Sequence, residues 1–437
     1  MNEKIEWYKK AYEVLKGGRQ NEPEWLLLLR EEAIAAFVRK GFPTVKEESW
    51  RYTDVAAIAG VPFESDETVP ALSPETLEVL KQKGGGSFLF VVNGKFSRVH
   101  SKIAEGIDVM DIGEAILTRP EIVQPYLGFC ASSAGDAFYA LNTAFFKSGL
   151  LIRVAENITL KEPIRAVFFT DASKEHTVSH PRNLVVMGAG SKGVLVETYV
   201  ASNGQSYLTN SVTEVLLEKG AILDHAKIQT ESVAAFHIAS THTLQRRASA
   251  FSSFSLSTGG RLARNECFVA LDDGEASCSL NGLYLGDREQ VLDQQTFVDH
   301  RKPDGNSHQL FKGLLAGNSR GVFSGRVMVR QDAQGTDAHQ TNKALLLSDT
   351  AKVDAQPQLE ILADDVKCSH GAAVGQLQED ALFYLRSRGI GEREAGQMLA
   401  QGFAREVIER TEIEFLKETL LEIVNEKLTR QFGSGKE

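Results

Sequence analysis

The chain has 437 residues, of which 42% are hydrophobic and 24% are charged, and its formal net charge is -10. This length exceeds one ordinary compact core, so two or three domains are expected, and the composition excludes global disorder. Because nucleic-acid affinity comes mainly from Lys and Arg, the acidic balance argues against DNA or RNA as a partner. The opening MNEKIEWYKKAYEVLKGG lacks the apolar core of a signal peptide, and no apolar run approaches the roughly 20 residues of a membrane span. We therefore expect a cytoplasmic protein without a membrane partner.

The N-terminal part, residues 1–149, is predicted to be mixed and mainly helical. Up to about Thr53, apolar residues recur at helical spacing until Gly41 and Pro43 end the pattern. The recurring residues are Trp25, Leu28, Leu29, Ala33, Ala36 and Phe37.

Two further elements are expected before residue 149. Ser87 to Val92 is predicted to be a strand that ends in a turn at Asn93-Gly94. The segment from about Ala134 to Phe146 is predicted to be a helix. One partly apolar face of this helix would be formed by Phe138, Leu141, Thr143 and Phe145.

Over residues 150–370 the pattern changes to short alternating runs separated by Gly, Asn, Asp and Ser. Period-2 alternation with frequent turn residues predicts strands. A turn-plus-strand unit recurs, for example in the residues leading to Ile222, Ala250 and Ser277. Its weak period of roughly 27 residues is in the range of solenoids. Stacked β coils explain this length better than a β-sandwich, so we predict a β-solenoid core.

The last part, residues 371–437, returns to helical patterns. EDALFYLRSRG ends at Gly389, a residue type that favours the position after a helix C-terminus. Two more helices are expected, from Glu392 to Ile408 and from Glu412 to Leu428. Apolar residues of the last helix form a stripe that must be buried, and we expect it to pack within this helical domain. Its members are Ile413, Leu416, Leu420, Val424 and Leu428.

A glycine-rich segment, Gly188 to Gly193, matches the GxGxxG pattern of dinucleotide-binding proteins and follows the strand-like NLVVM. That fingerprint needs a helix next, whose N-terminus meets the pyrophosphate. The following VLVETYV is typical of a strand, so we interpret the glycines as a tight β turn and reject a dinucleotide-dependent oxidoreductase. No GxxxxGK[ST] loop is present, so the chain is not expected to hydrolyse a nucleotide.

Two polar segments leave hydrolytic chemistry open. They contain Asp299, His300, Asp304 and His308, and Asp337 with His339. A Ser/His/Asp triad stays possible in principle, although no GxSxG nucleophile elbow is present. A β-solenoid hydrolase or lyase acting on sugars would use the first segment. Polar turns of a solenoid explain both segments more simply.

The cysteines are dispersed, and no pair has the CxxC spacing of a zinc ribbon or a ferredoxin. They are Cys130, Cys267, Cys278 and Cys368, and we expect the first three to be reduced, mostly buried thiols. Cys368 differs because His370 follows it at i+2, the spacing that places two side chains on the same face of a strand. Thiolate and imidazole both suit iron and iron–sulfur units, but two ligands cannot complete a site. A partner chain would have to supply the rest.

The strings around this pair resemble the SufB/SufD family of iron–sulfur cluster assembly proteins. The similarity is continuous over residues 311–390, from FKGLLAGNSRGVFSGRVMV through DAHQTNKALLLSDTAKVDAQPQLEILADDVKCSHGAAVGQLQEDALFYLRSRGI. The earlier ESWRYTDV, Glu48 to Val55, resembles the same family. Within it, CSHGAAVG and the short chain are more similar to the SufD branch than to SufB.

The resemblance implies a right-handed parallel β-helix flanked by helical N- and C-terminal segments, and a non-catalytic scaffold role. It implies pairing with a SufB-like paralogue through the end of the β-helix, and docking of a SufC-like ABC-type ATPase on the C-terminal helices. No cofactor is expected in the isolated chain, whereas a nascent iron–sulfur cluster or iron is expected at the interface with SufB. The family implicates His370 in assembly, so His370 and Cys368 are our candidate transient interface ligands. A homodimer of the isolated chain stays open.

Overall fold

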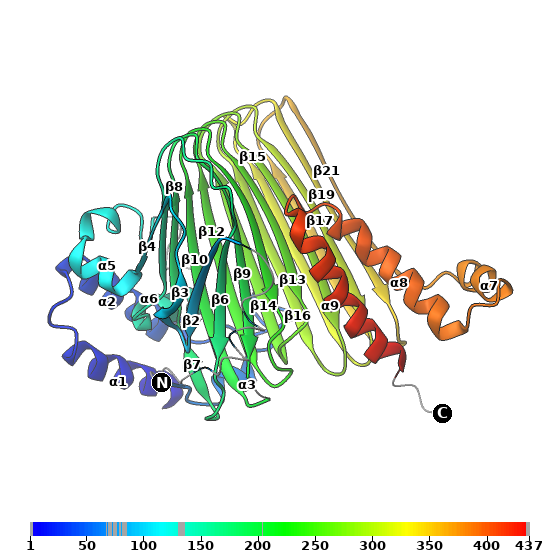
Figure 1. Ribbon diagram of the computed structural model, residues 1–437, viewed down its shortest axis with the longest axis horizontal. Coiled ribbons are helices and arrows are strands. Elements are labelled where there is room, and N and C mark those ends of the chain that lie inside the picture. Colours follow the sequence, from blue (N-terminus) through cyan, green and yellow to red (C-terminus); the bar gives the residue numbers. More distant parts are fainter. Residues whose placement is uncertain are drawn as a thin grey trace.

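The computed structural model describes residues 3–66, 68, 72, 77, 80, 85–129, 136–202 and 204–433. Within these ranges, no helix is both long and apolar enough to cross a membrane. Helices lie at both ends of a long run of strands (Figure 1). They are α1 (Glu3–Gly17), α2 (Glu24–Lys40), η1 (Glu48–Trp50), α3 (Ala56–Ala59), α5 (Ile112–Thr118), η2 (Pro120–Ile122), α6 (Ala137–Phe145), α7 (Glu379–Ser387), α8 (Glu392–Ile408) and α9 (Glu414–Gly433).

The strands form two long sheets between which the chain alternates. Sheet A has the order β20-β18-β16-β14-β12-β10-β8-β5-β4, and sheet B has the order β21-β19-β17-β15-β13-β11-β9-β6-β2-β3. The strands of sheet A are β4 (Ile107–Asp111), β5 (Leu150–Val154), β8 (Arg182–Met187), β10 (Tyr207–Leu217), β12 (Phe236–Gln245), β14 (Leu262–Leu271), β16 (Val291–His300), β18 (Arg320–Val329) and β20 (Lys352–Ile361). The short β7 (Thr177–Ser179) pairs with β10, and the short β1 (Glu64–Ser65) pairs with β7. Those of sheet B are β2 (Ser87–Val92), β3 (Lys95–Lys102), β6 (Ile164–Thr170), β9 (Lys192–Ala201), β11 (Ile222–Gln229), β13 (Ala250–Ser257), β15 (Ser277–Gly286), β17 (Asn306–Leu315), β19 (Thr336–Leu346) and β21 (Val366–Gln376).

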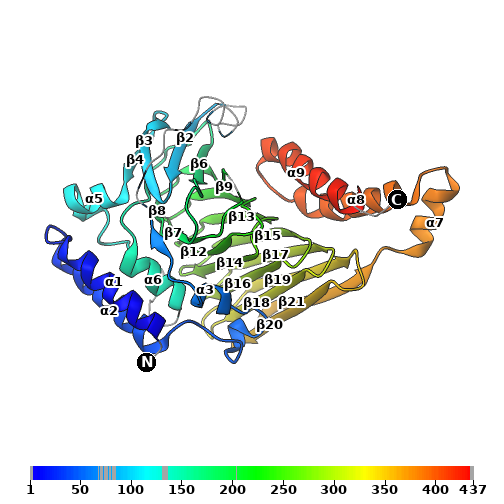
Figure 2. The same ribbon diagram turned by 90° about the horizontal axis from the view of Figure 1, so that it is seen from below.

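This arrangement is a parallel β-solenoid, which confirms the predicted fold class (Figures 1 and 2). From β8 to β21, neighbours within a sheet are parallel and come from successive coils. Ile222, Ala250 and Ser277 lie next to one another in register on three consecutive coils of sheet B. The weak repeat of the sequence is therefore one coil of the solenoid.

Aromatic rings fill the interior by lying over glycines of the next coil. Phe311 is in register with Gly282, and Tyr284 is in register with Gly313. A Cβ atom at either glycine would collide with the ring of its partner. The two glycines therefore make room for two aromatic side chains, which keeps the core densely packed. This explains the Phe and the first Gly of FKGLLAG.

The turns follow the glycine pattern. Asn93 and Gly94 both have positive φ, 49° and 80°, and connect β2 to the antiparallel β3 in the manner of a type I′ hairpin. Gly190 has a φ of 66° in the loop between β8 and β9, so the glycine-rich segment leads into a strand, as predicted. Gly389 has a φ of 87° just after α7, which confirms its predicted role in ending that helix.

The N-terminal helices cover the outer face of sheet A (Figure 2). The helix predicted from Ala134 begins at Ala137, and its first predicted residues, like Cys130, lie outside the described part of the chain. All side chains of α6 are buried, not only the predicted face, because α2 packs on one side and the sheet on the other. Tyr8 of α1 and Phe37 of α2 contact each other in the same core.

The helices α8 and α9 lie against the outer face of sheet B (Figure 2). The predicted apolar stripe from Ile413 to Leu428 is buried, and α9 packs on α8 within the helical domain, as predicted. The hydrophobic cluster that contains the stripe and Ala404 of α8 also includes strand residues such as Phe254 and Leu283, so it continues onto sheet B. Each of the five side chains stabilises this contact by about 1.5–3 kcal/mol through its burial. The division into residues 1–149, 150–370 and 371–437 stays a prediction; β21 continues to Gln376.

Candidate functional site at the open end of the solenoid

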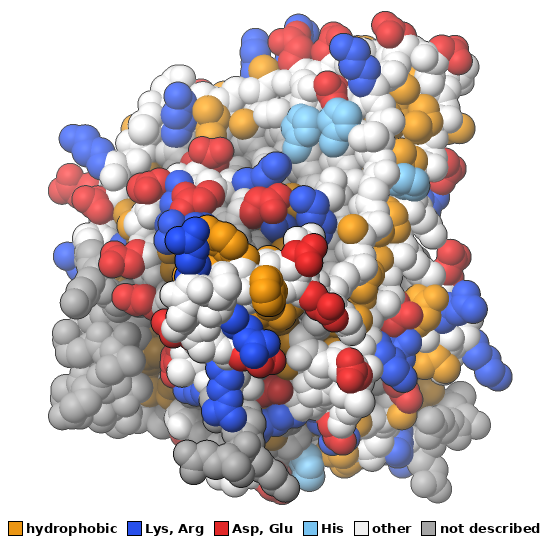
Figure 3. Space-filling model, turned by 90° about the vertical axis from the view of Figure 1, so that its right-hand side faces the viewer, with side chains coloured by type: hydrophobic (Ala, Val, Ile, Leu, Met, Phe, Trp, Pro, Cys, Tyr) orange, Lys and Arg blue, Asp and Glu red, His pale blue; other side chains and the backbone are white. Residues whose placement is uncertain are grey.

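The C-terminal end of the solenoid is open. Among the described strands, β20 pairs only with β18 and β21 pairs only with β19. Figure 3 shows this end of the molecule, with hydrophobic and histidine side chains at the surface. Ile361 is 40% exposed and Leu362 is 55% exposed at the end of β20. Such a free edge offers backbone hydrogen-bonding groups and apolar side chains to another chain.

Both residues of the predicted pair lie on β21, the edge strand of sheet B. Cys368 is in register with Ala338, and His370 is in register with Gln340 of β19. Cys368 is half-buried and packs on the interior core, whereas His370 is exposed because no further coil covers it. Residues at i and i+2 share one face of a strand, so the structure places the thiol and the imidazole on the inward face, at the open end.

The surroundings of Cys368 keep its thiol protonated. Burial raises the pKa of Cys368, and the negative charge of Asp337 raises it further, while a hydrogen bond from the backbone near Ala338 acts in the opposite direction. A thiol must lose its proton before it binds iron, so a metal or a partner group has to favour the thiolate here. Within the described part of the chain, no three or more His, Cys, Asp and Glu side chains are grouped so as to hold a metal ion.

A row of inward-facing polar side chains leads to His370, and the sequence analysis did not identify it. Gln309, Gln340 and His370 occupy equivalent positions on three successive strands of sheet B. The Gln309 Oε1 atom accepts hydrogen bonds from Thr296 Oγ1 at 2.7 Å and from Gln340 Nε2 at 3.3 Å. The sequence does contain polar residues at the same position of successive coils. Only the register of the strands shows that their side chains point inward.

The second predicted polar segment forms a ladder on the outer face of sheet B. The rings of His308 and His339 stack with centroids 5.3 Å apart. His339 Nδ1 lies 2.6 Å from Ser369 Oγ, and His339 Nε2 lies 2.8 Å from Asp337 Oδ1. The order of residues is that of a Ser/His/Asp triad, but Ser369 is exposed on an open strand surface. A triad depends on donors aimed at the reacting oxyanion, so we interpret the ladder as surface structure.

The side chains of the first polar segment, from Asp299 to His308, do not form one cluster. The Asp299 carboxylate accepts hydrogen bonds from Arg301 and Arg330. His300 points the other way, into the solenoid, where its Nε2 lies 2.8 Å from Ser307 Oγ. His308 lies on the opposite sheet. The hydrolase or lyase alternative therefore has no assembled site in this segment.

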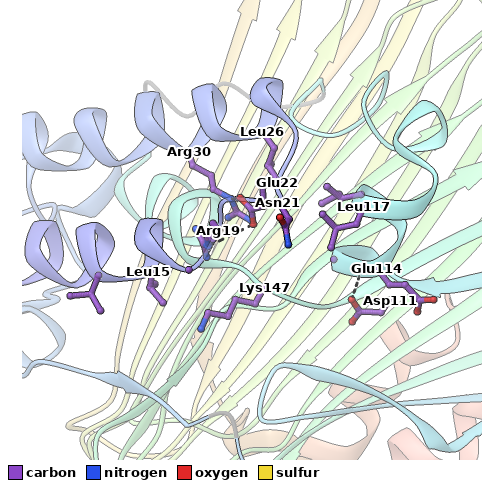
Figure 4. Close-up of a pocket in the computed structure, with 14 residues that line it drawn as sticks. Leu15, Arg19, Asn21, Glu22, Leu26, Arg30, Asp111, Glu114, Leu117 and Lys147 are labelled. Atoms are coloured by element: carbon purple, nitrogen blue, oxygen red, sulfur yellow. Dashed lines mark hydrogen bonds and ion pairs between the residues drawn. The ribbon is translucent and has the colours of Figure 1, made fainter.

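A cavity of about 540 Å³ lies between the N-terminal helices and α5 (Figure 4). Arg19, Glu22 and Arg30 converge in it. Arg30 Nε donates to Glu22 Oε2 at 2.9 Å, and Arg19 Nη1 donates to the carbonyl oxygen of Ala144 at 2.8 Å. These charged groups bind one another and the end of α6, so we interpret them as the attachment of the N-terminal helices.

The fold and the open end together define a class: a β-solenoid protein with an unpaired edge that presents a thiol and an imidazole. Residues 168–403 match the SufBD core domain, described as "SUF system FeS cluster assembly", and residues 2–166 match the SufBD protein N-terminal region. The chain therefore belongs to the SufBD family of iron–sulfur cluster assembly proteins, which confirms the resemblance seen in the sequence.

Characterised relatives agree with this assignment. The chain is 29% identical over 401 residues to iron-sulfur cluster assembly protein SufD of Escherichia coli, covering 91% of this chain and 92% of the relative. It is 32% identical over 390 residues to protein ABCI7, chloroplastic, of Arabidopsis thaliana, covering 87% and 82%. It is 29% identical over 394 residues to the SufBD family protein slr0076 of Synechocystis, covering 88% and 87%.

Proposed function

We propose that this protein is a non-catalytic scaffold subunit that pairs through β20 and β21 with a SufB-like paralogue during iron–sulfur cluster assembly. The observation that carries the proposal is the position of Cys368 and His370 on the inward face of β21, which pairs only with β19 among the described strands. A paired partner would continue both sheets and enclose the two side chains. The nascent cluster or iron then forms at this interface, with the remaining ligands from the partner.

The second partner in this proposal is a SufC-like ABC-type ATPase that docks on the C-terminal helices. The helix α7 carries Phe383 and Tyr384, which are 74% and 58% exposed. The groove beside it has a volume of about 350 Å³ and is lined by apolar residues such as Leu377, Leu399 and Phe403. Exposed apolar patches of this kind support a protein interface. This sequence has no GxxxxGK[ST] nucleotide-binding loop, which fits a complex in which the partner hydrolyses ATP.

The substitution His370→Ala tests the role of the site. Because His370 is exposed and makes its contribution at the interface, we expect the variant to fold and to form the complex with normal stoichiometry. Maturation of a cluster-dependent enzyme in cells should drop to the level of a strain without this gene. The measurements are that enzyme's activity and the subunit ratio of the purified complex.

His308→Ala is the matched control, because it removes an exposed histidine from the outer face of the same sheet. It should leave maturation unchanged. Normal maturation in the His370→Ala strain would rule out the proposed role, whatever the stability of the variant.

A further inference from the structure

The largest of the cavities described here lies away from the open-end pair, on the outer face of sheet A. It has a volume of about 680 Å³, which is in the range of small-molecule sites. Its floor consists of two ladders across β16, β18 and β20. One ladder contains Gln295, Ser324 and Gln356, and the other contains Phe297, Arg326 and Gln358. Residues 47–50 form the opposite wall, so the ESWRYTDV segment borders this cavity.

The buried Arg264 fixes that wall through contacts to protein groups. Its guanidinium stacks on Trp50 at 3.8 Å and donates to the carbonyl oxygen of Ser49 at 2.8 Å. It also donates to Asp293 Oδ2 at 2.5 Å and to Glu266 Oε1 at 2.7 Å. One positive charge therefore serves two buried carboxylates, and the local charge balance is negative.

Glu266 is the buried carboxyl group whose negative charge Arg264 does not fully neutralise. It is 5% exposed and lines the cavity. Its Oε1 atom is bound by both Nε and Nη2 of Arg264, and the described residues form no hydrogen bond to Oε2. Burial raises the pKa of Glu266 to about 7, and the negative charge of nearby Asp136 raises it as well, against the effect of Arg264. A buried carboxyl group in this state would gain from an additional cation.

The rest of the lining favours a cation with an apolar portion. Glu47, Glu48 and Asp136 add carboxylates to the wall. The second guanidinium among the described lining residues is that of Arg326, which pairs with Glu360 and also lies over the Phe297 ring, 5.5 Å from its centroid. The floor also contains the aromatic rings of Phe268 and Phe297, 6.4 Å apart. His242 stacks on Phe268 and Arg326 lies over Phe297, so the two rings offer apolar contact to the hydrocarbon stem of an ammonium or guanidinium group rather than a free aromatic face.

We propose that this cavity is a binding site for an organic cation, whose ammonium or guanidinium group contacts Glu266 and whose stem lies on Phe268 and Phe297. The same chemistry has two sources. A free diamine or polyamine could enter from solvent. A Lys or Arg side chain of a chain docked on the edge could also reach it, because β20 supplies Gln356 and Gln358 to the lining.

Calorimetric titration of the full chain at about pH 8, where Glu266 is ionised, tests the proposal. The probes are agmatine, spermidine and a capped Gly-Arg-Gly peptide. We expect at least one to bind, and Glu266→Gln to weaken it by about tenfold to a hundredfold, the usual effect of losing a charge-assisted hydrogen bond. Preference for the peptide indicates a protein side chain as the natural occupant, and preference for the free amines indicates a small molecule.

Two further variants make the experiment decisive. Phe297→Ala removes the aromatic floor without touching Arg264, so it should weaken binding even if Glu266→Gln lowers the melting temperature. Glu422→Gln on the exposed face of α9 makes the same change of net charge elsewhere and should bind as the unmodified chain does. No binding of any probe, or equal binding by the unmodified chain, Glu266→Gln and Phe297→Ala, overturns the proposal.

Discussion

Histidine residues of this chain occupy two kinds of environment. His180, His242 and His300 are buried, and burial lowers their pKa values to about 3, 3 and 4. They remain neutral and packed; His242, for example, stacks on Phe268 at 4.7 Å. His370 instead lies exposed on the edge strand. All of these side chains are imidazoles, but only an accessible imidazole can exchange protons or ligands with a partner.

The buried histidines make stability depend on pH. Their pKa values are depressed in the folded state, whereas unfolded histidine takes up a proton near pH 6.5. Stability is therefore complete above about pH 6.5 and falls as the pH drops towards 4, by up to about 1.4 kcal/mol per pH unit for each group. His242→Phe should reduce this dependence in urea unfolding at about pH 7 and pH 5. The exposed control His308→Gln should not, and an unchanged slope in His242→Phe would refute this explanation.

At the scale of elements, one buried lysine holds the C-terminal helices on the solenoid. Lys312 of β17 points outward beneath α8 and is fully buried. Its ammonium group donates to the carbonyl oxygen of Phe403 at 2.8 Å and also binds the carboxylate of Glu406. Lys343 of β19 approaches the same carboxylate at 3.2 Å, but its side chain is 42% exposed. In FKGLLAG, Lys312 therefore binds the outer helices, whereas Phe311 fills the interior and Gly313 makes room there for Tyr284.

Lys312→Met keeps the apolar stem and removes both hydrogen bonds. We expect a loss of about 1–3 kcal/mol in the free energy of unfolding. Amide hydrogen exchange of α8 and α9 should become faster than that of β13 and β15. Lys343→Met is the matched control, because a surface ion pair contributes at most about 1 kcal/mol. Equal effects of the two substitutions would show that burial of the ammonium group is not what secures α8.

The whole molecule is asymmetric, because the two ends of the solenoid differ. At the N-terminal end, the antiparallel strands β3 and β4 end the sheets, and β3 carries charged side chains that oppose edge pairing, such as Lys95, Arg98 and Lys102. At the C-terminal end, β20 and β21 remain unpaired among the described strands. Under the proposed function, the chain would extend at this end, towards a paralogue or towards a second copy of itself.

Charged residues at the open end should block this extension. Because Ile361 and Leu362 are exposed, the double substitution Ile361→Asp and Leu362→Asp should leave the melting temperature within a few degrees of the original. It should abolish co-purification with the SufB-like partner and any self-association in sedimentation experiments. Val99→Asp on β3, where Val99 is 88% exposed, controls for added charge. Retained association of the double variant would place the interface elsewhere.

Local patterns were sufficient for much of this structure. The period-2 runs, the glycines at positive φ and the helix boundaries at Glu392 and Ile408 are matched by the solenoid, its turns and α8. They could be predicted because alternation, turn geometry and helix ends depend on residues close together in the chain. The pairing of Cys368 with His370 on one strand face is local in the same sense.

Contacts between distant segments were decided only in three dimensions. The stripe of α9 alone could not show whether a helix or a sheet covers it, because any apolar surface satisfies the same hydrophobic demand. The charged segment from Asp299 to His308 was divided among an interior, an outer face and the opposite sheet, because each strand sends neighbouring residues to opposite sides. The polar row that ends at His370 arises from the register of the strands between coils. The incomplete charge balance at Glu266 arises from burial. By itself, the sequence determined the solenoid, the family and the candidate pair; the tertiary structure decided which side chains meet, because their contacts are set by residues far apart in the chain.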